Sequence, residues 1–377
     1  MTSPRTLVRP VAADPTPAPP EDRRTVPQGH TPRRVTVRIG PCSARFDGRT
    51  AAVSVVLAAI GVVMMIWSVS AGDVSIPLGT VLAEITGLGR GDRQVGLVIH
   101  TFRWPRVLTG ALVGAALGAS GQMFQRLLRN PLASPDIVGV SSGATLAAVV
   151  AILVLGLSGV GVTAAAVFGA VVAVAAIYLL AVNDGVSSYR LVLIGIGLTA
   201  MFEAGVGFLL SRAQINDAQR ALVWLTGSLN GRGWEYVRPL TLALVVLLPA
   251  AAFLMRQLRL VELGDDLATL VGVRTERAKL ALALVAAGLA AAATAAAGPV
   301  VFVALVAPQI ARRLVREQSV ALVPAALVGT VLVVSADLAA RRLFAPTEVP
   351  VGVLTAAVGA PVLWWLLTRA NRSGSGG

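Results

Sequence analysis

Long apolar runs separated by short polar connections fill the chain from residue 51 to residue 368. In hydrocarbon every backbone polar group must be paired within the protein, so such runs are predicted to be helices. The longest uncharged run, Ile137–Asn183, has 47 residues. It would form a single helix of about 70 Å, against a bilayer core of about 30 Å. We therefore divide it into two spans, with a turn at Gly156–Gly161.

A second long run, 280–311, is divided at Gly298-Pro299 because proline interrupts a helix. The pattern thus predicts an all-α polytopic membrane protein with about ten transmembrane helices. The expected spans are 51–72, 107–125, two within 137–183, 191–211, 239–255, two within 280–311, 318–336 and 349–368. Composition agrees, since 55% of the residues are hydrophobic and 14% are charged, whereas a soluble domain has about 25% charged residues.

The two ends of the chain differ from this membrane domain, which we place at 51–369. Residues 1–50 hold nine of the 21 prolines and nine arginines. A segment this polar buries too little surface to offset its ordering entropy, so it is predicted to be a disordered tail. Residues 370–377 are expected to form a short flexible tail.

The net charge of +13 is interpreted as a topology signal and does not indicate nucleic-acid binding, because the basic residues flank the apolar runs. With ten spans, 22 of the 32 basic residues fall on the side of the termini and ten on the other side. Basic residues favour the cytoplasmic side of a membrane protein. The sequence therefore predicts a multi-pass protein of a bacterial cytoplasmic membrane, with both termini in the cytoplasm.

Residue counts argue against a bound nucleotide, metal or cofactor. Lys279 is the only lysine and no Gly-Lys-Ser/Thr motif surrounds it, so the chain lacks a phosphate-binding P-loop. Two histidines and one cysteine make a metal cluster improbable. No set of nucleophile, base and acid converges, so we expect no catalytic site and no cofactor in this chain.

Within the spans, small residues indicate how the helices pack, and ionisable residues indicate a pathway or an ion pair. Gly110, Gly114 and Gly118 recur every four residues, a spacing that lets helix backbones pack closely in lipid. Glu203 lies inside a span, where it either lines a pathway or serves as a neutral structural acid. Asp337 precedes Arg341 by four residues, which favours an ion pair along one helix.

Five segments carry a resemblance that extends from about residue 51 to residue 369. They are Arg103-Trp-Pro-Arg106; Arg129-Asn-Pro-Leu-Ala-Ser-Pro-Asp-Ile-Val-Gly-Val-Ser-Ser-Gly-Ala144; Leu263-Gly-Asp-Asp-Leu-Ala-Thr-Leu-Val-Gly-Val273; 298–312; and 336–361. In this order they resemble the FecCD-type permease family of ABC importers for iron–siderophores, haem and vitamin B12. The sequence departs from the family pattern at Gln309, where His is usual, and at Ala304, where Gly is usual.

The resemblance implies a type II importer permease fold of ten spans and a set of partners. These are a second permease subunit (a second copy or a sister chain), two ABC ATPase subunits that use ATP and Mg, and an extracytoplasmic substrate-binding protein. The implied cargo is a ferric siderophore, with haem and cobalamin as alternatives.

It also implies three groups of site residues. The ATPase-coupling loop would contain Glu262, Gly264, Asp265, Asp266, Ala268 and Gly272. Arginines facing outside, Arg103, Arg106 and either Arg341 or Arg342, would dock the binding protein by charge complementarity. The fifth span with Glu203 would border the translocation path, and Ser141, Ser142 and Gly143 would narrow its cytoplasmic end or pack helices.

The alternative from another class is a secondary transporter of small organic solutes, driven by an ion gradient. Such transporters are built from broken helices and repeats, and they use intramembrane ionisable groups. Here Glu203 and Asp337 are the only comparable acids within the spans, which disfavours this alternative.

Overall fold

The computed structural model describes residues 34–39, 42–72, 76–87, 93–136, 139–181, 188–262, 265–315, 321–343 and 347–374. The chain divides into two units, one ending at Gly48 and one beginning at Arg49. The functional residues predicted above all belong to the second unit.

In the first unit, strands β1 (Arg34–Ile39) and β2 (Cys42–Asp47) pair in antiparallel fashion, with Val37 opposite Ala44. These strands fall within residues 1–50, the segment predicted to be a disordered tail, and that prediction remains untested. Arg34–Ile39 alternates polar and apolar residues, the period-two pattern of a strand, which the proline and arginine content obscured. Residues 1–33 lie outside the described residues.

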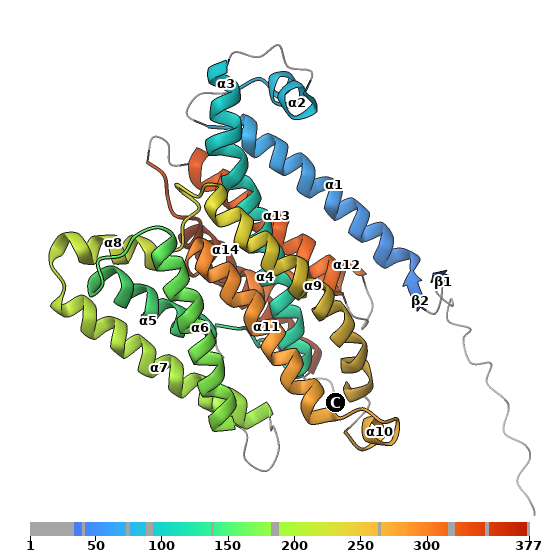
Figure 1. Cartoon of the computed structure of the whole chain (residues 1–377). Coiled ribbons are helices and arrows are strands. Elements are labelled where there is room, and N and C mark those ends of the chain that lie inside the picture. Colours follow the sequence, from blue (N-terminus) through green and yellow to red (C-terminus); the bar gives the residue numbers. More distant parts are fainter. Residues whose placement is uncertain are drawn as a thin grey trace, which may run out of the picture. The chain divides into compact units, whose positions relative to one another are not determined.

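Each of the ten predicted spans coincides with a helix of the second unit (Figure 1). The last helix ends at Gly374, within the segment predicted to be a flexible C-terminal tail. The helices are α1 (Gly48–Ser70), α4 (Trp104–Leu127), α5 (Val140–Leu153), α6 (Val160–Ala181), α7 (Ser188–Arg212), α9 (Trp234–Glu262), α11 (Thr275–Ala297), α12 (Val303–Val315), α13 (Leu322–Arg342) and α14 (Val351–Gly374).

Five shorter helical segments connect these spans. They are α2 (Leu78–Thr86), α3 (Arg93–Leu97), the π-helix η1 (Val98–Arg103), α8 (Ile215–Leu225) and α10 (Asp265–Leu270). Within the second unit, α2 and α3 lie at one end of the helix bundle and α10 lies at the opposite end (Figure 1). We call these ends the α2 end and the α10 end.

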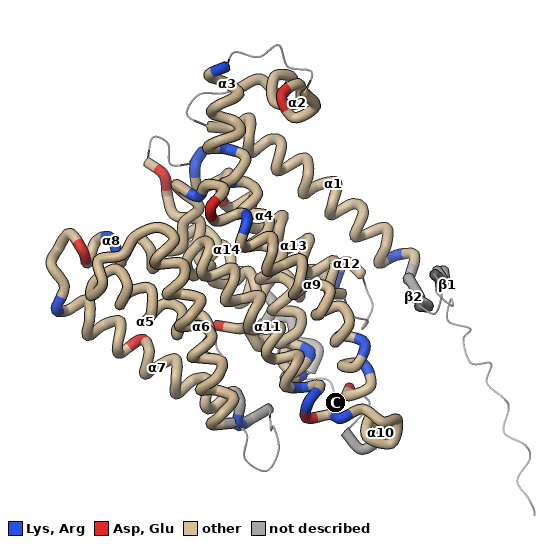
Figure 2. The backbone as a smooth tube through the Cα atoms, viewed as in Figure 1, with Lys and Arg blue, Asp and Glu red and all other residues tan. Residues whose placement is uncertain are grey.

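Among the described residues, seven helices are long and apolar enough to cross a membrane. The other three helices are not among these seven. Val140–Leu153 of α5 and Val351–Trp365 of α14 are apolar stretches of 10–17 residues, and α12 has 13 residues. Charged residues gather toward the ends of the helices, while the middle stretches are largely uncharged (Figure 2). The chain is a multi-pass helical membrane protein.

Helix α4 lies at the centre of the second unit, where it packs against α9, α11, α12 and α13. Its glycines allow this close approach, as the spacing predicted. A Cβ on Gly114 would overlap the carbonyl of Gly329 on α13, and a Cβ on Gly329 would overlap the carbonyl of Gly114. A Cβ on Gly118 would likewise overlap the Ala325 carbonyl. The two helix backbones are thus in direct contact along the glycine stripe.

Candidate functional site

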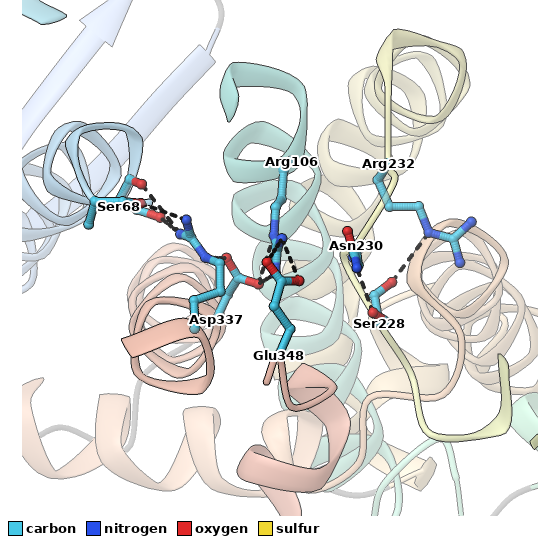
Figure 3. Close-up of polar contacts among 9 residues, drawn as sticks. Ser68, Arg106, Ser228, Asn230, Arg232, Asp337 and Glu348 are labelled. Atoms are coloured by element: carbon cyan, nitrogen blue, oxygen red, sulfur yellow. Dashed lines mark hydrogen bonds and ion pairs between the residues drawn. The ribbon is translucent and has the colours of Figure 1, made fainter. Parts of the chain in front are cut away.

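An ion cluster joins α4, α13 and the segment before α14 at the α2 end (Figure 3). Arg106 donates to Asp337 Oδ1 through Nη2 at 3.0 Å and through Nε at 3.2 Å. Its Nη1 lies 3.1 Å from Glu348 Oε2. The Asp337 side chain is only 4% exposed and the Arg106 side chain 13% exposed. Burial at this level requires that the charges be paired, and this cluster meets that requirement.

Arg341 extends the cluster from α13 to α1. Its Nε lies 3.1 Å from Asp337 Oδ2, which confirms the ion pair predicted from their i,i+4 spacing. Its guanidinium also donates to the Ala71 carbonyl at 2.8 Å and to Ser68 Oγ at 2.5 Å. Asp337 thus joins two arginines, and the cluster ties α1, α4 and α13 together at the α2 end.

The four arginines predicted to dock a binding protein differ in how they are placed. Arg106 and Arg341 (9% exposed) are committed to the buried cluster. Arg103 donates to the carbonyls of Val69 at 2.9 Å and Ser70 at 3.2 Å, so it fastens α1 to the start of α4. Arg342 is exposed. The geometry therefore favours Arg342 over Arg341 as a direct contact for a partner.

Beside the cluster, the loop before α9 contributes polar groups that the sequence did not single out (Figure 3). Ser228 Oγ accepts from the Asn230 amide at 3.1 Å, and the Ser228 carbonyl accepts from Arg232 Nε at 3.3 Å. The Arg232 guanidinium also stacks over the Tyr236 ring at 4.4 Å. The available signal was the Gly227 and Gly231 pair, since both glycines have positive φ and shape this turn.

At the α10 end, the predicted coupling loop contains the helix α10, as the resemblance implied. Ala268 is buried, whereas Leu270 is 83% exposed and the following Val271 is 70% exposed. Gly272 ends this turn with φ of 89° and donates its amide to the Thr269 carbonyl at 2.9 Å. Leu270 and Val271 thus form an adjacent pair of exposed aliphatic side chains at this end of the bundle.

The other residues predicted for this loop are described to different extents. Gly264 lies outside the described residues, and the side chains of Asp265 and Asp266 are not described. Glu262, at the end of α9, pairs with Arg126 of α4 at 3.2 Å. Arg129 donates to the Val261 carbonyl at 2.9 Å. The end of α4 thereby holds the end of α9, from which the loop emerges.

A polar network around Gln125 extends this anchor to α12. Gln125 Oε1 accepts from Arg312 at 2.6 Å and from Gln309 Nε2 at 3.1 Å, and its Nε2 donates to the Leu305 carbonyl at 3.0 Å. Gln309 also donates to the Pro131 carbonyl at 2.6 Å. Gln309, which departs from the family pattern, is thus a bridge between α4, α12 and the loop that follows α4.

The residues predicted to narrow the path are largely internal to this chain. Ser141 is buried and donates its hydroxyl to Asp136 Oδ1 at 2.6 Å. Burial raises the pKa of the Asp136 carboxyl, and the Ser141 hydrogen bond opposes this increase. A Cβ on Gly143 would overlap Ala173 of α6, so Gly143 serves helix packing. Ser142, between them, is partly buried.

Helix α7 exposes most of its surface, including Glu203. A Cβ on Gly197 or Gly207 would meet no atom within 4 Å. Ala200 and Ala204 are exposed on the same side at helical spacing. Glu203 therefore does not serve as a buried structural acid within this chain. Gly197, Ala200, Ala204 and Gly207 form an exposed stripe of small residues on α7.

Among the described residues, no group of three or more His, Cys, Asp and Glu side chains is placed to hold a metal ion. The polar groups at both ends form hydrogen-bond and ion-pair networks between helices of this chain. The arrangement suits protein contacts and movement between helices rather than bond chemistry.

Comparison with known proteins places these features in context. Residues 56–369 match the model of the FecCD transport family. The chain is 42% identical to the ferric enterobactin transport system permease protein FepG of Escherichia coli, over 82% of this chain and 94% of that protein. It is 39% identical to a probable siderophore transport system permease protein of Bacillus subtilis, over 85% and 95%. It is 37% identical to an Fe(3+)-citrate import system permease protein of the same organism, over 83% and 93%.

A solved structure of similar fold is described as a metal-chelate type ABC transporter in an inward-facing conformation. It superimposes with a TM-score of 0.72 at 27% identity, over 85% of this chain and 99% of that one.

Proposed function

Because this chain belongs to the FecCD transport family, we propose that it is the permease subunit of an ABC importer that brings ferric siderophores or similar iron chelates into a bacterial cell. The relatives named for ferric enterobactin, siderophores and ferric citrate support this cargo. The protein is a transport protein and not itself an enzyme. ATP and Mg are used by the partner ATPases.

The observation that carries the proposal is the exposed pair formed by Leu270, the last residue of α10, and Val271, which follows it. In the proposed complex, these side chains enter an apolar groove on an ABC ATPase, and α10 lies along its surface. The Arg126–Glu262 pair and the Arg129 hydrogen bond hold the base of this loop. Movement of the ATPases on ATP binding then passes through α9 into α4 at the centre of the bundle. Nucleotide-bound ATPases favour one conformation because they bind it more tightly.

This assignment makes the α10 end cytoplasmic and the α2 end extracytoplasmic. The excess of basic residues on the α10 side, where both termini are expected, supports the orientation. An acidic binding protein then meets the α2 end at Arg342, on a surface that the Arg106–Asp337–Arg341 cluster keeps rigid.

The open face of α7 is proposed as the contact with the second permease subunit. Its small residues allow two helices to approach, and the exposed Glu203 then borders the passage between subunits. Introducing Ala204→Cys in a Cys42→Ser background tests this contact. A disulfide between the two permeases is expected, formed either with a second copy or with a co-expressed sister permease that carries a cysteine at the matching position. Its absence in both arrangements would exclude the face.

The proposal is tested by placing a charge in the aliphatic pair. Leu270→Asp is expected to abolish copurification of the ATPase and uptake of ferric siderophore, while the permease remains in the membrane. Leu343→Asp, at an exposed aliphatic position on the α2 end, is the matched control and should leave ATPase copurification unchanged. Reversing Asp265 and Asp266 to arginine should weaken the same contact. Normal copurification with Leu270→Asp would reject the assignment of this surface.

A further inference from the structure

A groove runs between α6 and α11, and its lining includes none of the residues of the three partner contacts proposed above. Its volume is about 390 Å³, and it is open along one side. Ala170, Ala175 and Tyr178 line it from α6, and Leu280, Leu284 and Ala291 line it from α11. The lining is apolar except for the Tyr178 hydroxyl. Gly288 of α11 also belongs to the lining.

The dimensions of the groove suit one acyl chain of a lipid. From Leu280 to Ala291 the α11 wall extends about 16 Å at 1.5 Å per residue. One leaflet contributes about half of a hydrocarbon core of about 30 Å. The groove therefore extends over roughly the depth of a single leaflet.

One end of the groove is cationic. Arg277 is exposed one helical turn before Leu280, on the same stripe of α11. Arg274 and Lys279 lie in the same short segment, against the single acid Glu276. Figure 2 shows basic residues gathered at this end of α11, which is the α10 end. Tyr178 reaches the same end from α6, since α6 ends and α11 begins there (Figure 1). An apolar channel with a basic mouth matches a molecule with an anionic head and a hydrocarbon tail.

We propose that this groove is a binding site for an anionic phospholipid of the leaflet at the α10 end. One acyl chain lies between α6 and α11, and the phosphate lies beside Arg277 and Tyr178. Basic pockets between transmembrane helices bind anionic lipid headgroups in this way. The occupied groove would join α6 to α11 and so connect the α5–α6–α7 group of helices to the central bundle. The site does not depend on the ATPase contact proposed above.

The test compares two lipids and three variants of the full chain. Purified protein in detergent is titrated with phosphatidylglycerol or phosphatidylcholine, and the thermal midpoint and the number of lipids retained in native mass spectrometry are measured. Ala175→Phe fills the groove from an exposed position on α6. Val172→Phe, exposed on the same helix but outside the lining, is its control. Arg277→Gln removes the charge at the mouth.

We expect phosphatidylglycerol to raise the thermal midpoint of the unmodified protein and to be retained at least several-fold better than phosphatidylcholine. Ala175→Phe should lose the retained lipid, Arg277→Gln should lose the preference for phosphatidylglycerol, and Val172→Phe should keep both. Equal retention of the two lipids, or full retention by Ala175→Phe, would overturn the site. In a Cys42→Ser background, efficient disulfide formation between two copies carrying Ala175→Cys would show that a second permease covers the groove, and would also overturn it.

Discussion

Arg106 and Asp337 lie 231 positions apart in the sequence, yet their side chains form a double hydrogen bond, with distances of 3.0 Å and 3.2 Å, inside the helix bundle. The pair links the start of α4 to the end of α13, and Arg341 holds the second carboxylate oxygen of Asp337. Arg106 and Arg341 were expected to contact a partner protein. In the structure, both instead pair with Asp337 and hold helices together.

The first prediction concerns the buried carboxylate. Asp337→Asn removes the charge that two buried arginines share, and breaking a buried pair in this way costs about 3–5 kcal/mol of unfolding free energy. Because Glu348 still contacts Arg106, we expect a loss near the lower end of that range. Chemical unfolding in detergent measures it.

Asp217→Asn provides the control, because Asp217 pairs with Arg220 at the surface. Exposed pairs contribute about 0–1 kcal/mol. If Asp337→Asn and Asp217→Asn lower the unfolding free energy equally, the cluster is not a structural framework.

The second prediction concerns the contact between the α4 and α13 backbones. Gly329→Ala places a methyl group against the Gly114 carbonyl, so the helices must move apart, at a cost of about 1–3 kcal/mol typical of overpacking. Gly79→Ala is the matched change, since a Cβ there meets nothing within 4 Å. In a helix that change is neutral or stabilises by up to about 1 kcal/mol. Equal unfolding midpoints for the two variants would contradict the contact.

The third prediction is a pH dependence at Asp136. Burial raises the pKa of this carboxyl above its ordinary value of 3.8. Below 3.8 both the folded and the unfolded states are protonated. As the pH rises toward the raised pKa, the unfolded state releases its proton first, so the folded protein loses stability. Asp136→Asn stays neutral and should show a smaller decrease in unfolding midpoint over this interval.

Ser141→Ala serves as the companion to this variant. The Ser141 hydroxyl lowers the pKa of Asp136, so its removal should extend the loss of stability to higher pH. Identical pH profiles for the unmodified protein and for Asp136→Asn would show that this carboxyl does not titrate differently on folding.

The sequence located the helices well because its signal for them is local. An uncharged run such as Ile137–Asn183 determines where helices lie, and the glycines that break it determine where they end. The i,i+4 spacing of Asp337 and Arg341 and the glycine stripe on α4 are local in the same sense, and both are found as expected.

The partner of Arg106 could not be found in this way. No local pattern connects Arg106 to α13, and an arginine at the end of a span looks the same whether it faces solvent or a buried acid. The exposure of Leu270 and Val271 could not be predicted either, because two aliphatic residues in a loop look the same in sequence whether they are buried or exposed. The acidic residues Asp265 and Asp266 were the stronger signal in that loop. Strand β1 was hidden by the proline-rich composition around it.

ATP-dependent uptake by proteoliposomes tests the central claim most directly. The permease is reconstituted with its ATPase and binding protein, and entry of radiolabelled ferric siderophore is followed. Uptake is expected to require ATP, the ATPase and the binding protein together, and to be lost with Leu270→Asp. Uptake that continues without ATPase, and that follows an imposed ion gradient, would contradict the account and identify a secondary transporter.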